Sequence, residues 1–456
     1  MKKIVLALFF VFLLQACGGT PTVRTDSGTF AYEIKDDSVT IVDYRSRGET
    51  NVEIFIPETI RDLPVETIAK GAFTSSVSRG SLVAGIVVIP ESIQTVKQGA
   101  FSGSPGPNAI VLRAFEAPVG FQDGWNATVA PVVYDYASLD VEGDYRYVLT
   151  NSDTIVLLKL LDSFDETTLT TPQTIAGKPV VEIADQAALG NTTIETLIVS
   201  EGVSRIGREA FQNASSIQTV TLPQSLTTMG ERVFSGARSL EEVTFAEGIN
   251  LRVLPDGTFR SSSPLAQFSN NITHMHIPDS VERIGANVFL NASALESVTF
   301  GEESALKSVG EFAFRSTLKM DSIAFPNTLE VIERQAFRNS DIKEFVFPEG
   351  MTRIEHGLFM ESKNLEKVII GANIESVAEA AFRDCPKLET LIVYREAAQN
   401  ITTLDGWTSS LGRPFRQNHV NFAIYLPVDS FTEYSENDRW AFYADKLLTH
   451  DDLPTE

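Results

Sequence analysis

Residues Ile217–Phe234 read IQTVTLPQSLTTMGERVF, with apolar residues in a fixed order around one proline: Ile217, Val220, Leu222, Pro223, Leu226, Met229 and Phe234. The proline lies eleven residues before the phenylalanine, and this spacing recurs at Pro90/Phe101, Pro278/Phe289, Pro326/Phe337 and Pro348/Phe359. An aliphatic residue or methionine also stands five positions before a phenylalanine at ten places: Ile68/Phe73, Val96/Phe101, Ile206/Phe211, Met229/Phe234, Leu254/Phe259, Ile284/Phe289, Val309/Phe314, Ile332/Phe337, Ile354/Phe359 and Val377/Phe382. The chain is therefore built from an internal repeat.

The repeat unit is mostly 22 to 25 residues long and reaches 30 where RSSSPLAQFSNNITH is inserted before Met275. Val220 and Leu222 alternate inward on a short strand, and Pro223 ends the strand because it has no N–H to donate. No unit of this size can bury its apolar side chains alone, so neighbouring units must stack. The period predicts a right-handed α/β leucine-rich-repeat solenoid, with a parallel sheet on one side and short helical or irregular corners on the other.

Three segments carry a more specific motif: IPESIQTVKQGAF, LPQSLTTMGERVF and IPDSVERIGANVF, which end at Phe101, Phe234 and Phe289. They resemble the BspA-like branch of bacterial leucine-rich-repeat surface proteins, and the resemblance covers roughly residues 30 to 445. It implies a surface protein associated with adhesion and with binding of host or matrix proteins. It says little about the ligand, because repeat solenoids are scaffolds on which binding surfaces vary.

The chain has 456 residues and a formal net charge of −23. A surface this acidic repels phosphate backbones, so nucleic acid is an unlikely partner. The 29 phenylalanines are an unusual feature of the composition, and the repeat explains many of them as a stacked ladder.

The N-terminus predicts export and lipid anchoring. Residues 1–16 join MKK to a short apolar run, which is typical of a signal peptide. LQAC, which ends at Cys17, then resembles a lipobox, whose cysteine becomes the acylated first residue of the mature protein. The alternative is an ordinary cleaved signal in which Cys17 has no role. Gly18 lacks the aspartate that would favour inner-membrane retention, so we expect an outer-membrane, possibly surface-exposed lipoprotein.

We expect two tandem arrays behind this anchor. Residues 17–28 are small and polar and predict a flexible tether. Seven residues reappear 115 positions later, beginning with Tyr32 and Tyr147, which indicates a duplicated module. The predicted domains are a first array over 29–137, a second array over 138–429 and a C-terminal cap helix over 430–448 that covers the exposed end. In the second array Ala188 takes a phenylalanine position, where Leu189 would fill the space.

The sequence offers no catalytic motif, so we expect neither an enzyme nor a cofactor. Cys385 lies three residues after Phe382, at a repeat position that otherwise holds small residues, and a buried structural role is favoured over a nucleophile. His274 and His276 share one face of a strand, but Glu242 is the one credible further metal donor beside them. We therefore interpret the two histidines as solvated and predict no metal site.

The strand positions between the inward residues predict a binding surface. Val346, Ile369, Ile392 and Tyr425 occupy one such position on four successive strands and would form an apolar stripe about 14 Å long on the sheet's outer face. Acidic residues lie next to these outward strand positions, and Glu366 and Glu389 are beside the stripe. The alternative is that β-propensity alone favours these side chains.

These observations predict a non-enzymatic surface lipoprotein that binds an extracellular or envelope protein through the sheet face. A glycan-binding envelope component and a structural spacer without a ligand are the alternatives. Aromatic platforms would favour a glycan, and Phe55 and Tyr425 are the aromatic residues at the outward positions considered.

Overall fold

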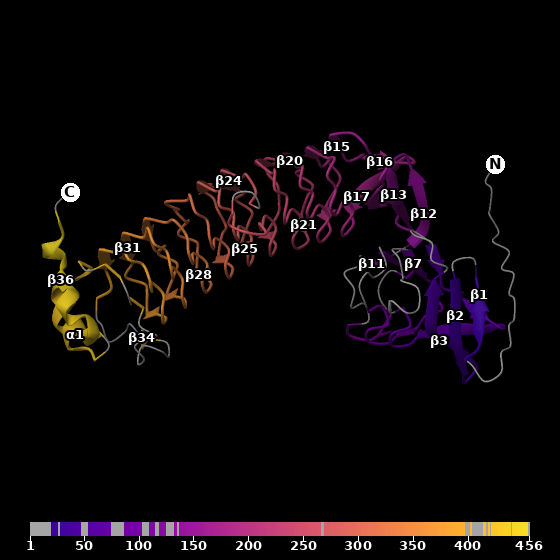
Figure 1. Ribbon diagram of the computed structural model, residues 1–456, viewed down its shortest axis with the longest axis horizontal. Helices are drawn as coiled ribbons and strands as arrows, with labels where there is room; N and C mark the ends of the chain where they lie inside the picture. Colours follow the sequence, from indigo (N-terminus) through magenta and orange to yellow (C-terminus); the bar gives the residue numbers. More distant parts are fainter. Residues whose placement is uncertain are drawn as a thin grey trace. The chain divides into compact units, whose positions relative to one another are not determined.

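The computed structural model describes residues 20–25, 28–46, 53–73, 86–102, 109–114, 118–124, 132–134, 136–265, 269–396, 402–403, 414–415, 418–419, 421–438 and 440–454 (Figure 1). The chain divides into two compact units, the first of residues 1–161 with 174–180 and the second of residues 162–173 with 181–456. The boundary expected between residues 137 and 138 stays a prediction.

The first unit opens with antiparallel strands and continues with parallel ones. Strands β1 to β3 form hairpins, and β3, β6, β8 and β10 then pair in parallel: β1 (Thr22–Arg24), β2 (Gly28–Lys35), β3 (Ser38–Ser46), β6 (Leu63–Ile68), β8 (Thr95–Val96) and β10 (Gly120–Phe121). A second parallel sheet contains β4 (Glu53–Phe55), β7 (Ile86–Ile89), β9 (Ala109–Leu112) and β11 (Val132–Val133). The core cluster holds side chains from both sheets, including Phe73 and Phe101, whose rings stack 4.7 Å apart.

The module that the sequence shows twice folds the same way twice. Strand β5 (Thr59–Ile60) pairs antiparallel with β6, so that Thr59 faces Pro64. At positions 115 residues later, β16 (Thr174–Ile175) pairs with β17 (Lys178–Ile183), and Thr174 faces Pro179. The hairpins β12 (Tyr136–Glu142), β13 (Tyr145–Thr150) and β14 (Ile155–Leu160) likewise repeat β1 to β3.

The second unit is a solenoid in which two rows of parallel strands run along opposite edges, as β20, β24 and β31 and then β21, β25 and β28 illustrate (Figure 1). The first ladder begins with β15 (Thr168–Thr170), which the sequence did not predict. It continues with strands that the repeat predicts: β18 (Thr196–Ile198), β20 (Thr219–Leu222), β22 (Glu242–Phe245), β24 (His274–Ile277), β26 (Ser297–Phe300), β29 (Glu344–Val346), β31 (Lys367–Ile370), β33 (Thr390–Val393) and β35 (Ala423–Leu426). Ser322 and Ala324, which the repeat places on a strand, lie outside any strand.

The fold class predicted from the period is confirmed, with irregular corners that follow a second ladder of short strands opposite the first. The two-residue strands of this second ladder carry the apolar residue found five positions before each phenylalanine: β19 (Arg205–Ile206), β21 (Thr228–Met229), β23 (Val253–Leu254), β25 (Arg283–Ile284), β27 (Ser308–Val309), β28 (Val331–Ile332), β30 (Arg353–Ile354) and β32 (Ser376–Val377). Strand β34 (Thr402–Thr403) continues this ladder without such a residue. Helices do not form at the following corners, because the residue two positions before the phenylalanine has a positive φ, for example 58° at Glu209 and 55° at Gln335.

The phenylalanines form the predicted ladder through the solenoid interior. Neighbouring rings stack with centroids between 5.2 and 6.0 Å apart, in the order Phe211, Phe234, Phe259, Phe289, Phe314, Phe337, Phe359 and Phe382. Phe415 continues the stack beyond Phe382 at 5.3 Å, although the sequence spacing does not mark it. Leu189 does not replace the phenylalanine missing at Ala188, because its side chain is exposed.

The C-terminal segment is divided where a single helix over 430–448 was expected. It contains η3 (Val428–Ser430), α1 (Phe431–Glu436), η4 (Trp440–Lys446), strand β36 (Leu447–Thr449) and η5 (His450–Asp452). Trp440 and Tyr443 contact Phe415 at the end of the phenylalanine ladder. Strand β36 pairs in parallel with β35 and adds one more strand to the first ladder.

None of the helices in the described part of the chain is long and apolar enough to cross a membrane. The predicted signal peptide and Cys17 lie outside the described residues. The flexible tether expected over 17–28 is corrected where it is described, because Thr22–Arg24 form β1 and pair with β2, and Val23 is buried.

Candidate functional site

The apolar stripe lies within one continuous five-stranded sheet, β29-β31-β33-β35-β36. Strand pairing places Val346 opposite Ile369, Ile369 opposite Ile392 and Ile392 opposite Tyr425. Tyr425 in turn faces Leu448 on β36, which extends the stripe by one strand. Leu448 was not predicted as part of the stripe, because its segment was expected to be a cap helix. The alternation of buried Leu447 with exposed Leu448 is typical of a strand.

Exposure along the stripe is uneven, and this corrects the expectation that all four side chains contact water. The exposed fraction is 59% for Val346, 6% for Ile392 and 7% for Tyr425, while Ile369 is partly buried. Leu448 at the far end is 38% exposed. Ile392 and Tyr425 are therefore packed residues, and the accessible apolar surface lies at Val346 with Ile369 and again at Leu448.

The neighbourhood of the buried residues is held by the C-terminal segment. The hydroxyl of Tyr434 on α1 donates a hydrogen bond to the carbonyl oxygen of Arg395 at 3.0 Å, just after β33. The ring of His450 lies 5.1 Å from that of Tyr394, and its Nε2 is 3.0 Å from the carbonyl oxygen of Val393. These contacts tie the C-terminal end of β33 to the segments that follow β35.

The acidic residues beside the stripe differ in their partners. Glu389 Oε1 lies 3.4 Å from His419 Nε2, whereas Glu366 is exposed and has no ion pair among the described residues. Elsewhere in this row, Glu296 pairs with Lys319 and Asp321 with Lys343. Exposed pairs of this kind contribute little to stability, so their charges stay accessible to a partner. Glu366, three residues before Ile369, and exposed Glu344, two residues before Val346, are thus negative charges without an ion pair among the described residues near the exposed part of the stripe.

The middle of the first ladder is polar. His274 Nδ1 lies 2.8 Å from the hydroxyl of Ser297, and His276 Nδ1 lies 3.1 Å from the hydroxyl of Thr299 on the next strand. Both histidines are exposed. Within the described residues, no three His, Cys, Asp or Glu side chains gather closely enough to hold a metal ion.

Cys385 is placed for structure rather than for chemistry. It is buried, and its thiol Sγ lies 3.1 Å from the carbonyl oxygen of Phe359. Burial raises the pKa of the Cys385 thiol well above its usual range, so the reactive thiolate is suppressed at neutral pH.

Comparison with known families agrees with this architecture. Residues 181–270 and 266–389 match the model of the BspA type leucine rich repeat region, with six copies of the repeat. Residues 181–389 are a BspA-type leucine-rich repeat region. The resemblance inferred from LPQSLTTMGERVF and IPDSVERIGANVF is thereby confirmed for residues 181–389.

Three solved structures are similar to the chain over most of its length. The pneumococcal vaccine antigen PcpA is 19% identical with a TM-score of 0.46, covering 96% of this chain and 99% of that chain. A leucine-rich repeat protein from Bacteroides ovatus is 14% identical with a TM-score of 0.38, covering 93% of this chain and 98% of that chain. A leucine rich cell surface protein from Faecalibacterium prausnitzii is 17% identical with a TM-score of 0.32, covering 88% of this chain and 99% of that chain. No curated protein matches the chain significantly.

Proposed function

We propose that the protein is a non-enzymatic, lipid-anchored component of the bacterial cell surface that binds a protein partner through the outer face of the β29–β36 sheet. The observation that carries the proposal is Val346, an aliphatic side chain 59% exposed on a strand, with partly exposed Ile369 beside it on the next strand. Adjacent apolar side chains at the centre of a contact, surrounded by polar groups, are the pattern of interface anchors.

A protein partner fits this surface better than a glycan does. Sugar binding commonly uses exposed aromatic faces, but Tyr425, the aromatic residue of the stripe, is buried. Accessible instead are aliphatic groups beside the carboxylate of Glu366. This combination favours a protein surface that presents an apolar residue next to a lysine or arginine.

The anchored location rests on the LQAC sequence before Gly18 and on the BspA-type repeat region. A lipid at Cys17 would hold the protein at the membrane, a few residues before β1 begins at Thr22.

The experiment compares capture of extracellular proteins by the wild-type chain and by a Val346→Thr, Ile369→Thr double variant. Threonine keeps β-branching, so the strands persist while the apolar contact is lost. The matched control is Val331→Thr, which alters an exposed valine on the second ladder. We expect a partner retained by the wild type and the control to be lost by the double variant, with at least a tenfold weaker Kd in direct titration.

Equal retention by all three proteins would reject this face as the binding surface. Binding to a glycan array that the double variant abolishes would replace the protein partner with a glycan. Absence of any captured ligand from either source would favour the structural spacer.

A further inference from the structure

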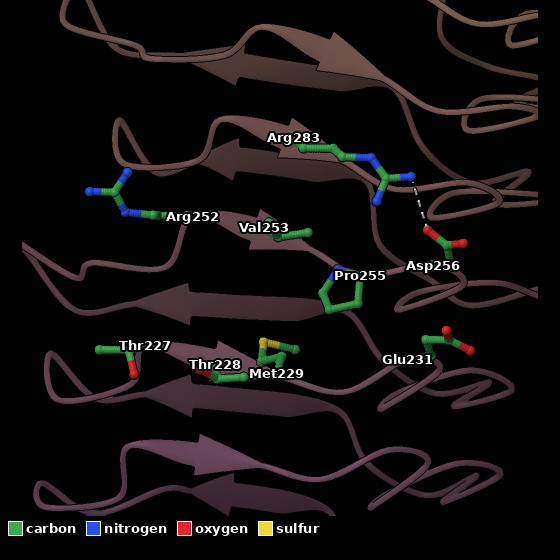
Figure 2. Close-up of a pocket in the computed structure, with 9 residues that line it drawn as sticks. All are labelled: Thr227, Thr228, Met229, Glu231, Arg252, Val253, Pro255, Asp256 and Arg283. Carbon is green, nitrogen blue, oxygen red and sulfur yellow. Dashed lines mark ion pairs between the residues drawn. The ribbon is translucent and has the colours of Figure 1, made fainter. Parts of the chain in front are cut away.

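A hollow interrupts the second ladder on the other side of the solenoid from the stripe. Its volume is about 340 Å³, and it opens between β21 and β23 (Figure 2). The side chains around it combine both signs of charge with apolar and hydroxyl groups: Thr227, Thr228, Met229, Glu231, Arg252, Val253, Pro255, Asp256 and Arg283. The size falls within the range of small-ligand sites in proteins.

Pro255 explains why the ladder opens at this point. At the equivalent position of other turns, a backbone N–H donates to the carbonyl oxygen of the preceding turn: Gly230 to Ile206, Gly285 to Leu254, Gly310 to Ile284 and Glu333 to Val309, at 2.8 to 2.9 Å. Proline has no N–H, so the carbonyl oxygen of Met229 loses the donor that this register would supply. Strands β21 and β23 accordingly are not paired.

The interruption is local, which makes it a defined site rather than a split in the solenoid. On one side of the hollow, β20 and β22 pair along their whole length on the first ladder. On the other side, the N–H of Arg232 donates to the carbonyl oxygen of Asp256 at 2.9 Å. The turns are therefore joined before and after the hollow, and backbone groups inside it remain available to a ligand.

Charge is arranged with opposite signs at the two ends. Figure 2 shows Arg252 on one side, Glu231 and Asp256 on the other, and Val253 and Pro255 between them. Arg283 contacts Asp256 at 3.5 Å, and Arg232 contacts Glu231 at 3.7 Å. Both carboxylates are well exposed, so a ligand ammonium group can compete for them. Arg252 also pairs with Glu282, but both side chains are well exposed, so a ligand carboxylate can compete for the guanidinium.

The geometry points to this hollow as a binding site for a short zwitterionic peptide. Its carboxylate would lie at Arg252, its ammonium group at Glu231 and Asp256, and its central side chain over exposed Val253. Arg252 and Asp256 are four residues apart on extended chain, about 13 Å, and an extended tripeptide spans about 10 Å. A backbone N–H of the peptide would donate to the carbonyl oxygen of Met229.

Titration calorimetry of the purified full chain with the tripeptide Ala-Val-Ala tests the site. The same peptide with an acetylated amine and an amidated carboxylate is the ligand control. We expect the free peptide to bind with a Kd in the micromolar to millimolar range and the blocked peptide to bind at least tenfold more weakly, because each charge-assisted hydrogen bond is lost.

Two variants address the chain itself. Pro255→Gly restores the N–H and the residue type of the neighbouring turns, so it closes the ladder and abolishes binding. Arg252→Ala raises the Kd of the free peptide about tenfold and leaves the Kd of the blocked peptide unchanged. Lys307→Ala, at the equivalent exposed position on a paired strand, is the control and binds like the wild type.

The proposal is overturned if the free and blocked peptides bind alike, if neither binds at millimolar concentration, or if Arg252→Ala binds as tightly as wild type. Should Pro255→Gly misfold, Arg252→Ala with Lys307→Ala still decides the outcome. The test does not involve Val346 or Ile369, so it is independent of the function proposed above.

Discussion

The ring of Phe337 stacks on that of Phe359, with centroids 5.2 Å apart and planes 12° from parallel. Both side chains are fully buried, and Phe314 stacks on the opposite face of Phe337 at 5.2 Å. Each phenylalanine thus completes the core of its own turn and of both neighbours. In a solenoid, stability is the sum of the units and the interfaces between them, so one ladder position influences three turns.

Phe337→Ala is expected to destabilise the protein by about 3 to 5 kcal/mol, since it removes a buried aromatic side chain and leaves a cavity. Unfolding would begin at this turn and spread to its neighbours. Thermal and urea unfolding followed by circular dichroism provide the measurement. Phe442→Ala removes an exposed ring of the C-terminal segment and is the control, expected to change stability by about 0.5 kcal/mol or less. Equal midpoints for both variants would contradict the ladder.

The phenylalanine ladder could be predicted because its spacing along the sequence is constant. In the repeats with a phenylalanine, an aliphatic residue or methionine stands five positions before it, as Ile332 does before Phe337. The sequence did not predict the second ladder, because two-residue strands such as β28 are too short to show an alternation. Phe415 was missed for a related reason, since the position five residues before it is Ser410. The second ladder and the position of Phe415 are both determined by the stacking of turns and not by a local sequence pattern.

Cys385→Ser is expected to change stability by about 1 kcal/mol or less, because the equivalent residue one turn earlier is already a serine. Ser362 Oγ donates a hydrogen bond to the carbonyl oxygen of Phe337 at 2.8 Å. The thiol of Cys385 contacts the carbonyl oxygen of Phe359 in the same way, at 3.1 Å. In a Cys17→Ser background, Cys385 should resist a thiol reagent at neutral pH until the protein unfolds, because burial raises its pKa. Rapid labelling of the folded protein would show that the site is open.

Cys17→Ser is expected to release the protein from the membrane fraction, because the thiol that would carry the lipid is removed. Metabolic labelling with a radioactive fatty acid, followed by fractionation, measures both effects. Cys385→Ser is the control and should keep both the label and the membrane association. Unchanged retention and labelling in the Cys17 variant would mean that the N-terminus is processed as an ordinary signal.

The candidate surface was partly predictable. Repeat register placed Val346, Ile369, Ile392 and Tyr425 in one row, and the strand pairs reproduce that row. Exposure was not predictable, because the burial of Ile392 and Tyr425 depends on tertiary packing that the repeat spacing does not encode. A repeat pattern fixes which way a side chain points but contains no information about what later covers it.

The contrast between Ile369 and Ile392 gives the sharpest test of the surface. The two residues face each other on β31 and β33, but Ile369 is partly exposed and Ile392 is 6% exposed. Ile392→Thr would bury a hydroxyl without an assigned acceptor and is expected to cost about 1 to 3 kcal/mol of unfolding free energy. Ile369→Thr can solvate its hydroxyl and should cost about 1 kcal/mol or less.

Measuring both variants by urea unfolding, and by affinity for any partner captured with the wild type, separates the two roles. We expect Ile369→Thr to lower affinity at nearly unchanged stability, whereas Ile392→Thr lowers stability first. If Ile392→Thr leaves the unfolding midpoint in place while affinity falls, Ile392 is reached by the partner, and the contact surface extends along the stripe towards Leu448. If both variants keep stability and affinity, β-propensity alone accounts for these side chains and the partner binds elsewhere.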